Sequence, residues 1–247
     1  VSPWQTKCQI DNLFFAIRGK GQVTISVFHC ALSETTLLAE TSTDLVFGSP
    51  QRVEIPQWKN LTEGLIYVRL QANTDVSIEA ASFDTDSTPT KPVKLGIVVT
   101  HFKRKAYVLP AIKRISETLL SNCDISDGLE LIVVDNSRDI EAHEAGKATL
   151  IPNQNLGGSG GFTRGLLHLK DHDFTHCLFM DDDASCELES IYRTYRLLQF
   201  AKDERLAVAG AMILEENLYQ THAIGGRIGR GIGTARAHGL DLQTPSA

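Results

Sequence analysis

The chain has 247 residues, of which 42% are hydrophobic and 22% charged, a composition typical of globular proteins and not of fibrous or disordered ones. Its 24 Lys and Arg residues against 30 Asp and Glu residues give a formal charge of −6, which argues against a general nucleic-acid-binding surface. Apolar stretches stay far below the ~20 residues of a membrane-spanning helix, and the five scattered cysteines contain no C-x-x-C pair. We therefore predict a cytoplasmic protein with reduced thiols that binds no nucleic acid.

Residues 1–88 alternate between apolar and polar side chains, as strands do. Val23, Ile25 and Val27 fall on one face of such a strand, and similar alternation recurs at 66–70 and 76–80. Turn-forming clusters separate these runs at 19–21, 48–50 and 60–64. The pattern predicts a small antiparallel β-sandwich, jelly-roll-like, that contains no helix of normal length.

A polar segment at 84–92 contains two prolines and shows no apolar period. Such a composition is typical of a linker. We place the first domain at 1–88, the linker at 89–94 and a second domain at 95–247.

From residue 95 onward, short continuous apolar runs alternate with helical periods. We expect strands at 95–100, 129–134, 148–151, 176–180 and 206–211. Helices are expected between them, with apolar faces formed by Val108, Ile112, Ile115 and Leu119 and by Leu188, Ile191, Tyr195 and Leu198. This alternation predicts an α/β fold with a mostly parallel, Rossmann-like sheet covered by helices.

Ligands of open α/β sheets bind in the crevice at the carboxyl ends of the strands. Four predicted strand ends carry polar or glycine-rich segments, at 100–104, 135–137, 153–161 and 181–183. We take these four segments as the candidate site.

The aspartate triplet Asp181, Asp182 and Asp183 carries the strongest chemical signal. Three adjacent carboxylates repel one another unless protons or a cation neutralise them. In an extended segment Asp181 and Asp183 point the same way, so their oxygens can converge on one Mg²⁺ or Mn²⁺, and Asp182 then faces a nucleotide or sugar. The competing interpretation is an acidic loop that caps a helix beginning near Glu187.

The glycine-rich run at 155–165 offers backbone amides at the start of a predicted helix, which suits a polar or anionic ligand. It is not a dinucleotide fingerprint, because Thr163 stands where the third glycine belongs, and no G-K-[ST] follows that would make it a P-loop. A flexible loop is the alternative interpretation.

Two further strand ends carry charge. Lys103, Arg104 and Lys105 could meet a base or a diphosphate, although a solvated helix start is the alternative and the preferred one for Lys105. Asp135 could accept a hydrogen bond from a nucleobase or ribose, and turn formation with Asn136 competes with that role.

Taken together, the spaced motifs T-H-F-K-R, V-V-D-N-S, N-Q-N-L-G-G-S-G-G-F-T-R-G and F-M-D-D-D resemble those of the GT-A fold in inverting glycosyltransferase family 2. More narrowly, they look like bacterial galactofuranosyltransferases. The resemblance covers about residues 95–215, and the preceding β-domain is similar to that family's architecture. It implies a GT-A nucleotide-sugar domain that transfers galactofuranose from UDP-galactofuranose, with inversion, to a glycan or lipid-linked glycan.

The resemblance also implies roles for single residues. At the donor nucleoside it implies Phe102 and Arg104 beside the uracil and Asp135 at the uridine. Near the diphosphate or sugar it implies Asn155 and Arg164, together with Asp182 at the donor sugar or ribose, and Gly158 belongs to the run expected to bind the donor. It implies that Asp181 and Asp183 ligate Mn²⁺ or Mg²⁺.

One departure from the family concerns the region after the triplet. Family members place a histidine metal ligand and an acidic general base downstream, whereas the histidines here are His222 and His238, and neither sits in the family's pattern. We therefore expect the general base beyond residue 247, and a domain that is incomplete at its C-terminus and weakly active. Association with the inner face of the plasma membrane and homo-oligomer formation stay open.

Three alternatives remain at this stage. The donor could be another nucleotide sugar, such as one of rhamnose. The chain could be a non-catalytic carbohydrate-binding protein with a degenerate nucleotide site. A nucleotidyltransferase also uses carboxylates and metal in an α/β sheet, but it usually carries a Gly-rich, Lys- or Arg-containing loop after its first strand.

Overall fold

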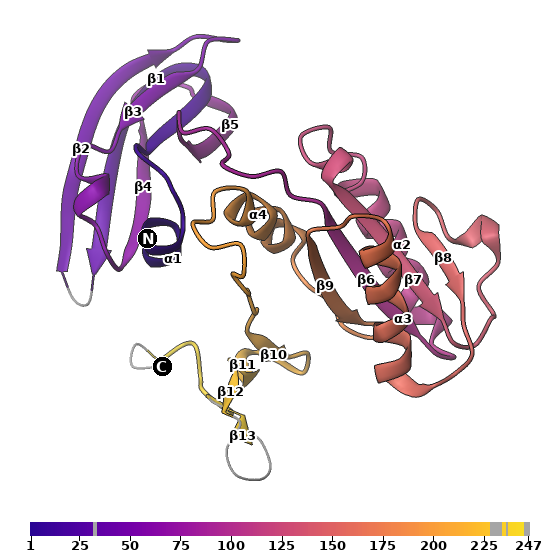
Figure 1. Ribbon diagram of the computed structural model, residues 1–247. Coiled ribbons are helices and arrows are strands. Elements are labelled where there is room, and N and C mark those ends of the chain that lie inside the picture. The colour runs from indigo at the N-terminus through magenta and orange to yellow at the C-terminus, as the bar shows by residue number, and fades with distance from the viewer. Residues whose placement is uncertain (32–33, 228–233, 236, 245–247) are drawn as a thin grey trace. The chain divides into compact units, whose positions relative to one another are not determined.

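The computed structural model describes residues 1–31, 34–227, 234–235 and 237–244. The chain forms two compact units, Val1–Glu204 and Arg205–Ala247. Within the first unit, an antiparallel sheet precedes a parallel sheet with helices (Figure 1). The predicted order of the two sheets is therefore confirmed, and the domain boundary at 89–94 stays a prediction.

The antiparallel sheet is organised around one long strand. β1 (Phe14–Ala31) pairs antiparallel with β2 (Glu34–Leu45), β3 (Gln51–Glu54), β4 (Leu65–Ala72) and β5 (Ser77–Asp84). The inward residues Val23, Ile25 and Val27 are almost fully buried, as the alternation predicts. Up to Asp84, the described helical elements are the six-residue α1 (Ser2–Lys7) and the short 3₁₀ turn η1 (Trp58–Asn60).

Residues 19–21 are not the turn that the sequence suggests. They lie inside β1, where the strand changes partners: residues 14–20 pair with β5, and residues 21–31 pair with β2. A Cβ at Gly19 would lie 2.2 Å from Ser77 O, and Gly21 has a φ of +103°. These glycines let one strand bend between two sets of neighbours, because no side chain obstructs the close backbone approach.

The parallel sheet has the strand order β8-β7-β6-β9. Its strands are β6 (Leu95–His101), β7 (Leu129–Asp135), β8 (Thr149–Pro152) and β9 (His176–Asp181). Four of the five expected strands are thus confirmed. β6 and β7 are buried along nearly their whole length, as strands covered on both faces are.

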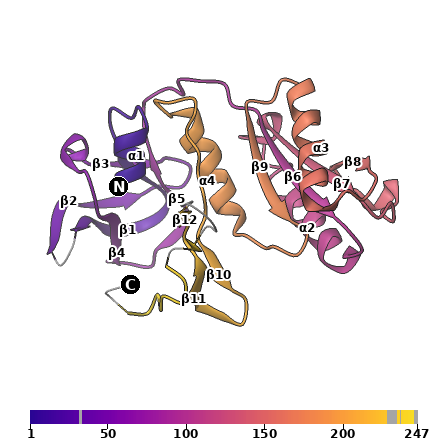
Figure 2. The same cartoon turned by 60° about the horizontal axis from the view of Figure 1, so that its bottom comes forward.

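Three helices accompany this sheet: α2 (Lys105–Thr118), α3 (Gly157–Asp171) and α4 (Leu188–Gln199). Figures 1 and 2 show α2 and α3 on opposite sides of the strands. The face of α3 that meets β6 is made of small residues, because a Cβ at Gly161 would lie 2.2 Å from Thr100 and one at Gly165 would lie 2.3 Å from Val98. Two of the glycines in the glycine-rich run therefore serve helix packing.

Both ends of the polar segment 84–92 are hydrogen-bonded. Arg52 Nη1 donates to Asp86 Oδ1 at 2.7 Å, which ties the start of this segment to β3. The amide of Thr90 donates to the carbonyl of Gln199 at 3.0 Å, which ties its end to α4. The backbone of Gln9 also donates to Phe200 O at 2.8 Å.

The described residues of the second unit form two short antiparallel pairs, β10 (Met212–Leu214) with β11 (Asn217–Ala223) and β12 (Gly226–Arg227) with β13 (Thr234–Ala235). The strand expected at 206–211 is wrong. Those residues have no regular secondary structure and are mostly exposed, so their apolar side chains do not enter a core. None of the described helices combines the length and apolar character needed to cross a membrane.

Candidate functional site

The parallel sheet brings all four predicted strand ends to one edge. The chain runs outward from β6 to β7 and β8 and then returns to β9 on the other side of β6. The topological switch point therefore lies between the carboxyl ends of β6 and β9, where open α/β sheets bind ligands. The register pairs Thr100 with Asp181 and His101 with Asp135. The segment 100–104 and the aspartate triplet consequently meet.

Asp182 is the buried member of the triplet, with 7% of its side chain exposed. Its Oδ2 accepts the backbone N–H of Phe102 at 3.1 Å and lies 3.2 Å from His101 Nδ1. Its Oδ1 accepts a bond from Arg104 Nη1 at 3.3 Å. Asp182 thus joins the end of β9 to the loop after β6 and faces that loop instead of open solvent.

The two outer aspartates are accessible. Asp183 accepts a short hydrogen bond from Arg104 Nη1 and keeps 45% of its side chain exposed. Asp181 is exposed, and its carboxylate accepts no hydrogen bond from the described residues. Burial therefore alternates along the triplet in the way expected of an extended segment, although β9 ends at Asp181 and a turn follows.

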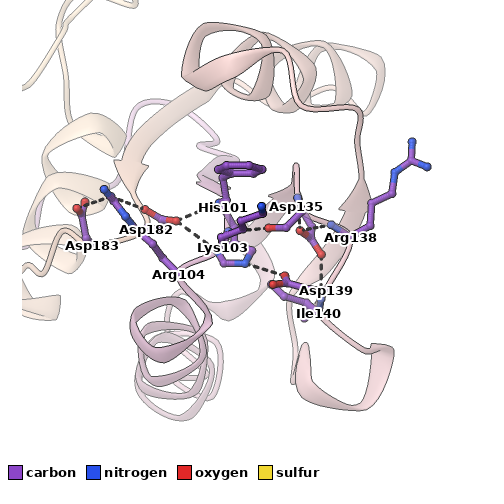
Figure 3. Close-up of polar contacts among 11 residues, drawn as sticks. His101, Lys103, Arg104, Asp135, Arg138, Asp139, Ile140, Asp182 and Asp183 are labelled. Carbon is purple, nitrogen blue, oxygen red and sulfur yellow. Dashed lines mark hydrogen bonds and ion pairs between the residues drawn. The ribbon is translucent and has the colours of Figure 1, made fainter.

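His101 is fully buried between two carboxylates (Figure 3). Its Nδ1 lies 3.2 Å from Asp182 and its Nε2 lies 2.9 Å from Asp139 Oδ1. Each ring nitrogen of His101 therefore faces one carboxylate. Burial acts to raise the pKa of Asp139, but the hydrogen bond from His101 and its charge prevail and the pKa lies below its usual value.

Asp135 is 1% exposed, and its carboxylate is occupied by backbone amides. Oδ1 accepts the N–H groups of Ser137 at 2.9 Å and Arg138 at 2.7 Å, and Oδ2 accepts that of Ile140 at 3.0 Å. These three bonds shape the loop after β7, so the turn-forming interpretation accounts for Asp135. A carboxylate has about four acceptor sites, so these three amides leave one unused on a side chain that is buried.

The outer aspartates fit a divalent cation by their chemistry and access. Carboxylate oxygens are the ligands that Mg²⁺ and Mn²⁺ prefer, and both Asp181 and Asp183 reach solvent. Within the described residues, however, the triplet does not form a group of three ligand atoms lying within 4.8 Å of one another.

His101, Asp135 and Asp139 do form such a group, and it could hold a metal ion. Its polar atoms already have partners in the protein. Both nitrogens of His101 face carboxylates, and Asp135 accepts three backbone N–H groups. An ion there would have to displace the bond between His101 and Asp139.

The glycine-rich run opens α3 at the same edge. Asn155 Oδ1 accepts the N–H of Gly157 at 3.0 Å, which starts the helix with a side-chain turn. A Cβ at Gly158 would meet nothing within 4 Å, and Arg164 is exposed on the second turn. Gly158 and Arg164 are therefore open to a ligand, whereas Gly161 and Gly165 are packed.

The loop after β6 presents one aromatic ring. Phe102 is 41% exposed, and Lys103 adopts a φ of +55° while its N–H donates to Ser137 Oγ at 2.7 Å. Lys105 pairs with Glu144 at 2.6 Å, and this bond raises the pKa of the lysine. Lys105 is thus engaged at the start of α2, away from the triplet.

Sequence reasoning gave His101 no role and did not single out Asp139. The signal available for His101 was its position at a strand end, within the motif T-H-F-K-R. Asp139 lies four residues beyond the strand, where only the path of the loop brings it back to His101. His222 and His238 lie together in the second unit, with ring centroids 5.5 Å apart.

Two curated proteins are similar to this chain. Galactofuranosyltransferase GlfT2 of Mycobacterium tuberculosis is 27% identical over 179 residues, which are 68% of this chain and 28% of that protein. Galactofuranosyltransferase GlfT2 of Mycolicibacterium smegmatis is 27% identical over 174 residues, 66% of this chain and 26% of that protein. No protein-family model matches.

The chain thus spans about a quarter of the length of these relatives, and it is a distant homologue of them. This similarity confirms the resemblance to galactofuranosyltransferases. The arrangement of the parallel sheet and its helices is consistent with a GT-A-like α/β domain.

Proposed function

We propose that this chain carries the donor-binding domain of a metal-dependent glycosyltransferase. The observation that carries the proposal is the aspartate triplet at the switch point between β6 and β9, with two of its carboxylates open to solvent. The distant homology to galactofuranosyltransferases supports galactofuranose, carried by UDP, as the sugar transferred. The acceptor would be a glycan or lipid-linked glycan.

The donor nucleoside would lie against the loops after β6 and β7. Phe102 offers an exposed ring on which a uracil can stack. Asp135 retains acceptor capacity for a uridine hydrogen bond beside the three amides that it accepts. Because Asp182 is buried, it would act on the donor by holding the loop of Phe102 and Arg104 in place.

The diphosphate would lie between the triplet and the start of α3. Asp181 and Asp183 would hold a Mn²⁺ or Mg²⁺ ion, which when bound supplies positive charge for the leaving diphosphate. Gly158 leaves backbone amides accessible at the start of α3, and Arg164 lies about 1.7 helical turns further on. Asn155 orders the helix start through its bond to Gly157.

In an inverting transfer, a base removes the acceptor hydroxyl proton as that oxygen attacks the anomeric carbon. The groups assigned here serve the leaving-group half of that reaction. The carboxylates at the switch point would hold the cation, and the arginines would provide donors for charge that develops on the diphosphate. The general base has no assignment among the site residues.

Calorimetric titration of UDP in the presence of Mn²⁺ tests this function. The parent protein should bind UDP more tightly than ADP or GDP and should lose binding when the metal is chelated. Asp183→Asn should weaken UDP binding at least about tenfold, as the loss of groups at metal sites does. Asp171→Asn, an exposed aspartate at the end of α3, serves as the matched control and should bind like the parent.

A second variant distinguishes the two places for the ion. If Asp139→Asn abolishes metal-dependent UDP binding while Asp183→Asn leaves it intact, the His101 group and not the triplet holds the cation. Equal binding of UDP, ADP and GDP by the parent would remove the basis for a uridine donor.

A further inference from the structure

Arg104 lies against the aspartate triplet, on the side where a cation is needed. Its Nη1 donates to Asp182 Oδ1 at 3.3 Å and to Asp183 Oδ2 in a shorter contact (Figure 3). The negative charges of adjacent carboxylates repel one another unless a positive charge lies nearby. In the unliganded protein Arg104 supplies that charge.

The two bonds of Arg104 differ in what else holds each carboxylate. Asp182 keeps the Phe102 N–H and His101 as partners when the arginine leaves. Asp183 has Arg104 as its partner among the described residues. Moving Arg104 away would therefore leave the buried aspartate compensated and would set the exposed one free.

Arg104 can move without disturbing a packed region. Its side chain is 52% exposed, and the residue lies at the N-cap of α2 without a side-chain capping bond. Its bond to Asp183 joins two groups that both reach water, and such exposed pairs are weak. Arg104 can therefore exchange this bond for other partners at little cost.

We propose that Arg104 is a latch on the aspartate triplet, which occupies Asp183 in the unliganded protein and must leave before a divalent cation can bind there. The inference rests on the proposed function, since it takes Asp183 as a cation ligand. Once released, the guanidinium presents several N–H donors beside the site, in a geometry suited to a diphosphate. One side chain thereby couples cation entry to nucleotide binding.

The latch predicts opposite effects of one substitution in two measurements. Without nucleotide, Arg104→Gln removes a competitor for Asp183 Oδ2 and a nearby positive charge, so Mn²⁺ should bind about three- to tenfold more tightly. With saturating Mn²⁺, the same variant lacks a donor for the diphosphate, so UDP should bind about tenfold more weakly. A residue that only supports the fold would weaken both.

Electron paramagnetic resonance of free Mn²⁺ measures the first effect without any turnover. Arg193→Gln is the matched control, because Arg193 also pairs with a carboxylate, that of Glu189 at 2.9 Å on α4, and it lies outside the site. Its Mn²⁺ affinity should equal that of the parent. Mn²⁺ affinity in Arg104→Gln that equals or falls below the parent's overturns the latch.

The UDP titration distinguishes failure of the latch from failure of the proposed donor-binding function. If the parent binds no UDP, the proposed function fails while the Mn²⁺ comparison still decides the latch. If Arg104→Gln does not fold, as judged by circular dichroism, Arg104→Lys replaces it. The more strongly hydrated ammonium should yield Asp183 more readily, giving a smaller gain in Mn²⁺ affinity, and no gain would contradict the latch.

Discussion

Asp182 is a buried carboxylate that little water reaches. The free-energy cost of burying it depends on the groups that contact it. An isolated carboxylate in such a position is costly, but one that accepts several charged or backbone hydrogen bonds is tolerated. His101 provides one of these contacts and also reaches Asp139 on the opposite side. The histidine therefore links the loop after β7 to the turn after β9.

Replacing His101 should accordingly destabilise the fold. His101→Asn removes an imidazole from a fully buried position and leaves Asp182 with fewer donors. We expect a loss of about 2–4 kcal/mol in the free energy of unfolding, measured by urea denaturation. His172→Asn, at an exposed position at the end of α3, should change the free energy of unfolding by less than about 0.5 kcal/mol. An unchanged midpoint in His101→Asn would mean that the two carboxylates do not depend on the ring.

The location of the triplet could be predicted from the sequence, but its buried contacts could not. A continuous apolar run followed by three aspartates marks a strand end, and strand ends of a parallel sheet share one edge. The contact between His101 and Asp182 depends on β6 and β9 being neighbours, which no local pattern around either residue encodes. Asp139 depends in addition on the path of the loop after Asp135.

At the scale of elements, α3 combines two uses of glycine. The sequence run at 155–165 suggests one ligand-binding segment, whereas the structure divides it. Gly161 and Gly165 face β6 at distances that exclude a Cβ, and Gly158 faces open space. The difference follows from the side of the helix that meets the sheet, since residues four apart share a face.

Two alanine substitutions separate these uses. Gly165→Ala places a methyl group 2.3 Å from Val98 and should push α3 from the sheet, at a cost of about 1–3 kcal/mol in the free energy of unfolding. Gly158→Ala meets no atom within 4 Å and should stabilise the helix by up to about 1 kcal/mol. Thermal or urea unfolding measures both, and a stable Gly165→Ala would contradict close packing of α3 on β6.

On the scale of the whole chain, the sequence predicts two sheets in order and a polar connection between them. The order is as expected because apolar periodicity changes from alternation to continuous runs near residue 95. The partner exchange inside β1 cannot be predicted from the sequence, since glycines in a turn and glycines in a bent strand look alike there. Side chains at both ends hold this polar connection in place, and composition alone does not predict their contacts.

Arg52 holds the start of this connection. Its guanidinium contacts Asp86 and Glu54, and the bond from Arg52 lowers the pKa of Asp86 to about 2. Because the pKa of Asp86 is depressed in the folded protein, stabilisation from this pair is present above the ordinary value of 3.8 and is lost as the pH falls toward 2. The pair is therefore intact at neutral pH.

Limited proteolysis at neutral pH should show what this pair does for the linker. Arg52→Met should leave residues 84–88 less firmly attached to β3 and raise the rate of cleavage between 84 and 92 about two- to fivefold, as the loss of an exposed pair allows. Lys113→Met is the matched control, since Lys113 pairs with Glu117 at 3.9 Å on the surface of α2, and neither residue contacts the segment 84–92. Fragments sized by mass spectrometry locate the cuts. Cleavage inside the antiparallel sheet in preference to the linker would contradict both the boundary predicted at 89–94 and the role of Arg52 in holding it.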